Sequence, residues 1–168
     1  MPYLSLVRIF FHIKRQFFPA PAWNEVASGI YLGRMALPSE RPAATALVVD
    51  LTCEFARPAE KEAKGPAYRS LPALNRFIPN PHCFRELLSE LVEYQSPIFV
   101  HCGAGYGRAA AFVAALLIAR GLAADVDQAE RQMRAIRVGV RLHAVQRSLV
   151  SCCGISAWNR SRERRESQ

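Results

Sequence analysis

Residues 97–120 read PIFVHCGAGYGRAAAFVAALLIAR, and the order of residue types in this stretch is the strongest indication of the fold. Its first four residues are a short apolar run of the kind that forms a buried strand. A turn with three glycines follows, and then an alanine-rich apolar segment, Ala109–Arg120, which Gly121 closes as a helix. In this order, the helix start presents free N–H groups and positive potential to the turn, so the stretch predicts an anion site.

Strand patterns recur on the N-terminal side of this stretch. Ile30–Leu32 is a short apolar segment, and Ala46–Leu51 (ALVVDL) is a continuous apolar run expected of a strand buried on both faces. Tyr68–Leu71 predicts a further short strand. The charged stretch 57–66, bounded by Pro and Gly, predicts a surface loop between them.

Helix signals separate and follow these strands. Asn80 before Pro81 is a capping pair that predicts a helix to about Tyr94. Asp125 with Gln128 resembles a capping box that opens a helix. Strands alternating with helices predict an α/β fold with a central, mainly parallel sheet and helices on both faces. The two later helices are expected at 125–137 and 142–152.

The composition narrows the classes of partner. The 168 residues are 51% hydrophobic, and 22 Lys and Arg against 14 Asp and Glu leave a formal charge of +8, which favours anionic partners. No nucleic-acid motif occurs, so no specific nucleic acid is expected. The five cysteines lack the spacing of a disulfide framework, and no apolar run is long enough to span a membrane, so a cytoplasmic protein is predicted. The histidines are scattered along the chain, so no zinc site is expected.

Three segments make up the predicted domain organisation. Residues 1–22 are expected to hold an N-terminal amphipathic helix and a linker, 23–155 the folded domain, and 156–168 a basic C-terminal tail. In the helix, residues 3–18 carry one polar stripe with two arginines and a histidine. Such a helix either packs on the domain or lies on a membrane surface, so peripheral membrane contact is left open.

The glycine-rich turn also carries the chemistry. Its backbone amides can fold inward as an anion nest, and they should favour the thiolate form of Cys102 at its base. A thiolate beneath a bound phosphate can attack phosphorus and form a phosphocysteine. Arg108 can grip two phosphate oxygens as a fork. The predicted phosphate-binding residues are Gly103, Ala104, Gly105, Tyr106, Gly107 and Arg108.

The spacing from Cys102 to Arg108, preceded by His101, resembles the signature loop of the protein tyrosine phosphatase superfamily. The segment Ser28–Gly33 (SGIYLG) is similar to a strand of its dual-specificity members, and the resemblance covers roughly residues 23–150. It implies a phosphatase that uses a phosphocysteine intermediate and no metal or organic cofactor. The implied substrates are proteins bearing phosphotyrosine or phosphoserine/threonine, or phospholipids. His101 is implied to orient the loop.

Two positions depart from the family pattern. Ala109 stands where most members carry a Ser or Thr that assists thiolate departure, which makes the loop similar to that of the phosphatases of regenerating liver. Slow breakdown of the phosphoenzyme is the implied consequence. The general-acid position holds Asn75, and an amide has no proton to give at neutral pH. The chain has three aspartates, and none of them occupies that position.

Because of these two departures, other functions are also compatible with the sequence. The chain could be a low-turnover phosphate-binding pseudophosphatase or an interaction module, or it could act on RNA 5′-triphosphates, where the leaving group needs less acid. Glu54 is the best substitute acid, while Asp50 is expected to make structural hydrogen bonds. By the same resemblance, Cys53 is a candidate redox partner that protects Cys102 through a disulfide. The other cysteines are expected in helix cores.

Overall fold

The computed structural model describes residues 21–53 and 65–154. The helix expected at 3–18, Glu54 and the expected tail at 156–168 lie outside the described residues. None of the helices in the described ranges is long and apolar enough to cross a membrane.

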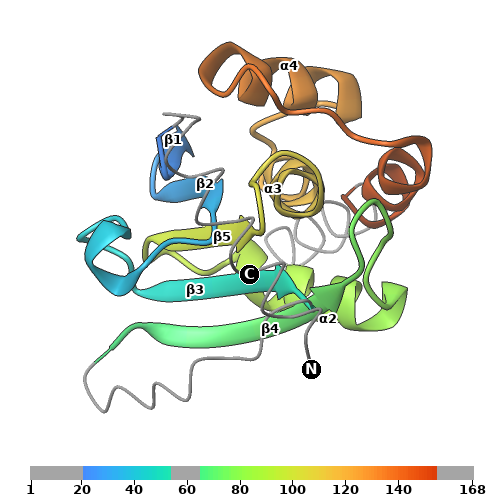
Figure 1. Cartoon of the computed structure of the whole chain (residues 1–168). Helices are drawn as coiled ribbons and strands as arrows, with labels where there is room; N and C mark the ends of the chain where they lie inside the picture. The colour runs from blue at the N-terminus through green and yellow to red at the C-terminus, as the bar shows by residue number, and fades with distance from the viewer. Residues whose placement is uncertain (1–20, 54–64, 155–168) are drawn as a thin grey trace, which may run out of the picture.

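Five strands form one sheet in the order β1-β2-β5-β3-β4 (Figure 1). Only β1 and β2 pair antiparallel; β2 with β5, β5 with β3, and β3 with β4 are parallel. The prediction of a central, mainly parallel sheet is therefore confirmed. The strands are β1 Trp23–Ala27, β2 Ile30–Arg34, β3 Leu47–Thr52, β4 Ala67–Ala73 and β5 Ile98–Cys102.

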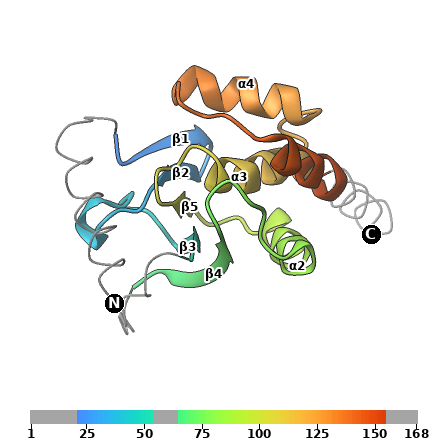
Figure 2. The ribbon, with the colours of Figure 1, turned by 45° about the vertical axis from the view of Figure 1, so that its right-hand side comes forward.

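The helices pack on one face of this sheet in the part of the chain that the structure describes (Figure 2). They are α2 Pro81–Val92, α3 Arg108–Ala119, α4 Val126–Ile136 and a further helical segment at 144–154. The opposite face carries a smaller cluster around Val48 and Phe99, next to the 3₁₀ helix η1 Pro38–Glu40. The expected cover of α-helices on both faces is thus seen on one face only, within the described residues.

The central helix α3 explains the alanine-rich sequence. All twelve of its residues are buried, because it lies against β2, β3 and β5 and between α2 and α4. Small side chains let the neighbouring elements approach closely on every side of it. This packing fixes the direction of α3, so its N-terminus opens at the carboxyl edge of the sheet.

The predicted helix starts are confirmed at atomic level. The Asn80 side chain accepts hydrogen bonds from the amides of His82 and Cys83, and Asp125 accepts one from the amide of Gln128 at 2.7 Å. The Gln128 side chain bonds the amide of Ala124 instead of that of Asp125, so the capping box is shifted by one residue.

Two expectations about individual segments differ from the structure. The edge strand β1 was not predicted, because WNEVA mixes polar and apolar residues and a bulge interrupts its pairing. Cys83 and Cys152, expected in helix cores, are exposed, whereas Cys153 is buried. Cys83 falls beside the buried stripe of α2 that begins at Phe84.

Candidate active site

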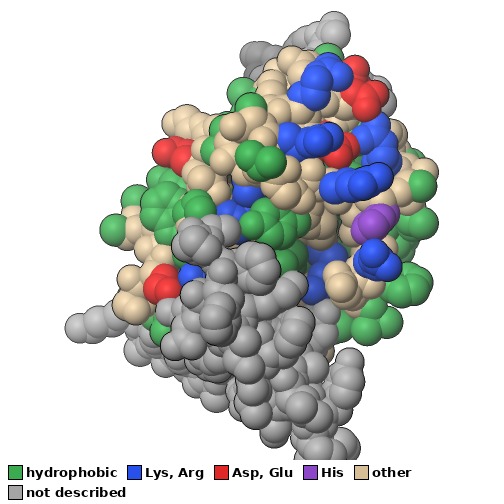
Figure 3. Space-filling view, turned by 45° about the horizontal axis from the view of Figure 1, so that its top comes forward, with side chains coloured by type: hydrophobic (Ala, Val, Ile, Leu, Met, Phe, Trp, Pro, Cys, Tyr) green, Lys and Arg blue, Asp and Glu red, His purple; other side chains and the backbone are tan. Residues whose placement is uncertain are grey.

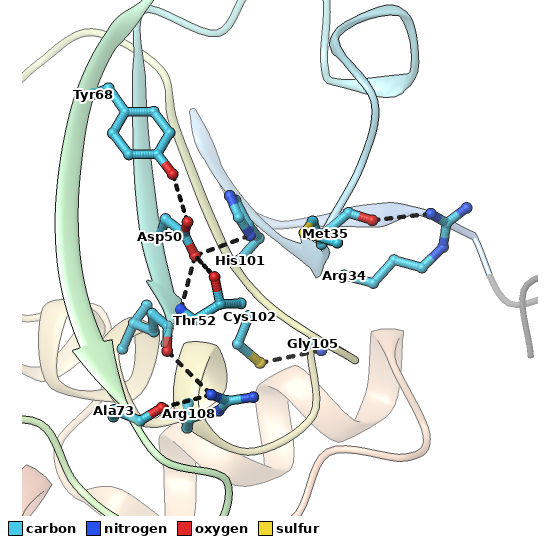
Figure 4. Close-up of polar contacts among 11 residues, drawn as sticks. Arg34, Met35, Asp50, Thr52, Tyr68, Ala73, His101, Cys102, Gly105 and Arg108 are labelled. Atoms are coloured by element: carbon cyan, nitrogen blue, oxygen red, sulfur yellow. Dashed lines mark hydrogen bonds and ion pairs between the residues drawn. The ribbon is translucent and has the colours of Figure 1, made fainter. Parts of the chain in front are cut away.

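The loop between β5 and α3 is built around Cys102, the last residue of β5. The thiol is buried, with 3% exposure, and the amide of Gly105 donates a hydrogen bond to its Sγ over 3.3 Å (Figure 4). The amide of Met35 donates to the Cys102 carbonyl at 2.7 Å, which ties the start of the loop to the end of β2. The sulfur therefore lies inside the curve of the loop, facing its amides.

Arg108 closes the loop as the first residue of α3. Its Nη1 donates to the carbonyls of Ala73 at 2.6 Å and Leu51 at 3.3 Å, near the carboxyl ends of β4 and β3. These bonds hold a buried guanidinium on the same side of the loop as the Cys102 thiol (Figure 4). The thiol and the planar cation that the sequence pairs by spacing are thus brought together in space.

Arg137 holds the outer side of the same loop. Its Nη2 and Nε donate to the carbonyls of Ala104 at 3.2 Å and Gly105 at 3.1 Å, and its guanidinium carbon lies 4.6 Å from the centroid of the Tyr106 ring. In a trans peptide the C=O and N–H point in opposite directions. The carbonyls therefore face Arg137, and the Gly105 amide faces Cys102.

Burial lowers the pKa of Arg137 from its ordinary value. The nearby Tyr106 and Cys102 oppose this shift. A third nitrogen, Nη1, bonds the Asn24 side chain at 2.9 Å and so couples the loop to β1. Arg137 was not predicted as a site residue, because nothing in the local sequence distinguishes it from the surface arginines around it.

Two glycines let the loop approach the sheet. Gly105 has a φ of +76°, and a Cβ built on it would lie 2.4 Å from the Gly33 carbonyl carbon and oxygen. Gly33 is equally confined, because its own Cβ would lie 2.7 Å from the Phe99 ring. The close backbone contact between β2 and the loop therefore excludes a side chain at Gly105, whereas the Ala22 carbonyl oxygen, 2.5 Å from the built Cβ, and the Phe99 ring exclude one at Gly33.

We expect Gly105→Ala to destabilise the fold by roughly 1–3 kcal/mol, from backbone strain and overpacking. Gly107→Ala is the matched control, since its Cβ would meet only the Gln146 side chain, at 3.7 Å. Urea unfolding of both variants measures the difference. Equal midpoints would show that the loop can relax away from Gly33.

His101 lies behind the loop, on the opposite face of the sheet from Cys102. Its ring packs on Phe99, and its Nδ1 lies 3.6 Å from Asp50 Oδ1. Burial is the largest cause that lowers the pKa of His101, opposed by the Asp50 charge. Asp50 accepts hydrogen bonds from Tyr68 and from the Thr52 amide and hydroxyl, as expected of a structural carboxylate. Asp50 therefore faces away from the loop.

Asn75 lies in an exposed turn just after β4. The amide of Phe77 donates to the Leu74 carbonyl across this turn, which begins one residue after the Arg108 contact at Ala73. Gln146 connects the turn to the loop: its Nε2 reaches the Phe77 carbonyl at 3.5 Å, and its side chain faces Gly107. The segment that carries position 75 thus lies next to the Cys102 loop, through the Arg108 contact at Ala73 and through Gln146.

Cys53 follows the end of β3 at the same edge of the sheet and is exposed. Neither it nor Cys102 is in a disulfide in this structure. Its role as redox partner stays a prediction.

A protein-family model identifies the family of the domain that contains this loop. The model of the Swiss Army Knife protein, DSP-PTPase phosphatase domain (PTP-SAK), matches residues 44–152, which include β3, the whole loop and α4. The chain belongs to this family. The PTP-SAK domain is of the dual-specificity type within the protein tyrosine phosphatase superfamily, as the resemblance of the loop implied. No curated protein matches the chain significantly.

Solved structures share the fold of this PTP-SAK domain. PTPMT1 in complex with PI(5)P has a TM-score of 0.70 at 17% identity, covering 83% of this chain and 99% of that chain. Tk-PTP in its active form has a TM-score of 0.67 at 21% identity, covering 83% and 98%. The human tyrosine phosphatase-like serine/threonine/tyrosine-interacting protein has a TM-score of 0.62 at 20% identity, covering 78% and 94%.

Proposed function

We propose that this domain hydrolyses phosphomonoesters with Cys102 as the nucleophile. The observation that carries the proposal is the Gly105 amide directed at the Cys102 sulfur, with the Arg108 guanidinium on the same side of the loop. An amide aimed at sulfur also suits a phosphoryl oxygen held in the same nest. His101 supports the loop from behind, and Arg137 holds its carbonyls outward.

The reaction runs in two displacements. The Cys102 thiolate attacks phosphorus, an S–P bond forms, and the P–O bond to the leaving group breaks. The loop amides and Arg108 hold the equatorial oxygens, where charge is spread in the transition state. A water molecule then attacks phosphorus, the S–P bond breaks, and the thiolate is regenerated as phosphate leaves. No step needs a metal ion or an organic cofactor.

Position 75 selects among leaving groups. Asn75 cannot protonate a departing oxygen, so aryl oxides such as that of phosphotyrosine leave more easily than alkoxides. The proposed substrates are phosphorylated proteins or phospholipids, and the phosphoinositide held by PTPMT1 supports the second class. Glu54, the proposed substitute acid, would widen the range of leaving groups.

A second candidate function is phosphate binding with little turnover. Asn75 favours it, and so does Ala109, a fully buried residue without a hydroxyl next to Arg108. The domain would then act as a pseudophosphatase that captures phosphorylated partners.

Trapping of the phosphoenzyme tests the proposal. We expect acid quenching during turnover of an aryl phosphate to yield protein phosphorylated on Cys102, because formation outpaces breakdown when Ala109 lacks a hydroxyl. Intact mass and peptide mapping identify the adduct. The Ala109→Ser variant is expected to release phosphate faster and to accumulate severalfold less adduct.

Two results would speak against the enzyme. Turnover without any cysteine adduct in either variant excludes the phosphocysteine route. Binding of inorganic phosphate without turnover or adduct supports the pseudophosphatase.

A further inference from the structure

Two segments lie next to the Cys102 loop: 74–80, which follows β4, and 138–146, which follows α4. The first begins beside Ala73, the Arg108 partner, and Gln146 of the second bonds the Phe77 carbonyl of the first. The second segment also contacts the loop directly, since the Arg141 amide donates to the Tyr106 carbonyl at 3.1 Å. We call these two segments the rim. Figure 1 shows the loop after β4 beside the last helix.

The rim exposes apolar side chains that a solvated loop would not need. Four of the seven exposed large hydrophobic side chains in the described ranges lie on it. Val138 is the most exposed, at 85%. Apolar exposure concentrated on two neighbouring segments marks an interaction surface more than a scatter of single residues would. The four are Leu74 at 62%, Phe77 at 63%, Val138 and Val145 at 55%.

The charge of the rim has one sign. The sequences LNRFIPN and VGVRLHAVQ contain exposed Arg76 and Arg141 and no acidic residue. The acid nearest in the sequence is Glu86 on α2, which pairs with His82. The acids that precede the second segment, Asp127 and Glu130 on α4, are both paired with Arg147. Figure 3 shows Lys and Arg side chains on one face of the molecule, with a histidine, hydrophobic side chains and a smaller number of Asp and Glu side chains among them.

We propose that the rim docks the domain on an anionic lipid bilayer. Apolar side chains at loop tips enter the acyl boundary, while neighbouring arginines pair with anionic headgroups. An anionic bilayer binds this combination of apolar and cationic side chains and does not require acidic side chains on the protein. A protein partner would have to present an acidic surface of matching shape, whereas any anionic bilayer supplies both negative charge and an apolar interior. The formal charge of +8 acts in the same direction.

Vesicle co-sedimentation of the full chain tests this docking, with Cys102→Ser as background so that turnover plays no part. We expect binding to vesicles of phosphatidylcholine mixed with phosphatidylglycerol and much weaker binding to phosphatidylcholine alone. The double variant Leu74→Ser/Val138→Ser should weaken the partition about tenfold or more for each side chain that no longer inserts. Raised salt should weaken binding further.

Leu122→Ser is the matched control, because Leu122 is an exposed apolar residue, at 47%, between α3 and α4 and outside the rim. It should leave vesicle binding unchanged. Circular dichroism checks that each variant is folded.

Three outcomes would overturn the docking proposal: no binding to the mixed vesicles, equal binding by the double variant, or equal losses in the double variant and Leu122→Ser. Binding of a phosphopeptide that the double variant loses, without vesicle binding, would assign the rim to a protein partner instead. Hydrolysis does not enter this measurement, so failure of the proposed enzyme activity and failure of docking remain distinguishable.

Discussion

Cys102→Ser is expected to remove measurable phosphatase activity, a loss on the order of 10⁶-fold, the scale seen when an enzyme loses its nucleophile. A serine hydroxyl is a poor nucleophile unless a base activates it. Around Cys102 the structure places amides and Arg108, which stabilise anions but accept no proton. His101, the adjacent imidazole, lies on the other face of the sheet with Phe99 and Asp50. Release of phosphate from an aryl phosphate measures the loss.

Phosphate binding should survive this substitution. The Gly105 amide and the Arg108 guanidinium, which we propose to hold the phosphoryl group, are unchanged, so the affinity for inorganic phosphate or tungstate should stay within a few-fold, by calorimetry. Cys83→Ser, which alters an exposed thiol on α2, is the matched control and should keep full activity. Activity retained by Cys102→Ser would assign the chemistry to another residue.

The sequence predicts the loop well because its information is local. A strand, a glycine turn and a helix lie within 24 consecutive residues, and the spacing from Cys102 to Arg108 sets what the turn can bring together. The helix starts at Asn80 and Asp125 are local in the same sense, since each cap bonds amides two or three residues away.

Long-range contacts account for what the sequence does not show. Arg137 bonds Asn24, which lies 113 residues away, and the carbonyls of Ala104 and Gly105, more than thirty residues away. These bonds exist only once α4 has packed over β1. Cys83 is a second example. Its helix is predicted correctly, but its exposure is not, because the position of the sheet determines which side of the helix is buried.

Asn75→Asp is expected to raise turnover of substrates with poor leaving groups by about 10²–10⁴-fold, the usual contribution of general acid catalysis. Position 75 lies in the turn next to the Cys102 loop, two residues after the Arg108 contact at Ala73. An aspartic acid there could protonate the departing alkoxide. An aryl phosphate leaves without such help, so its rate should rise much less.

The pH profile separates this effect from improved binding. A general acid works only when protonated, so the added activity should fall as the pH rises through the pKa of the new aspartate, while the parent lacks this limb. Asn75→Ala is the matched control: it removes the amide without adding a proton donor and should show no gain. Equal rates for Asn75→Asp and Asn75→Ala on an alkyl phosphate would show that position 75 does not face the leaving group. The acid would then have to come from another residue at the carboxyl edge of the sheet.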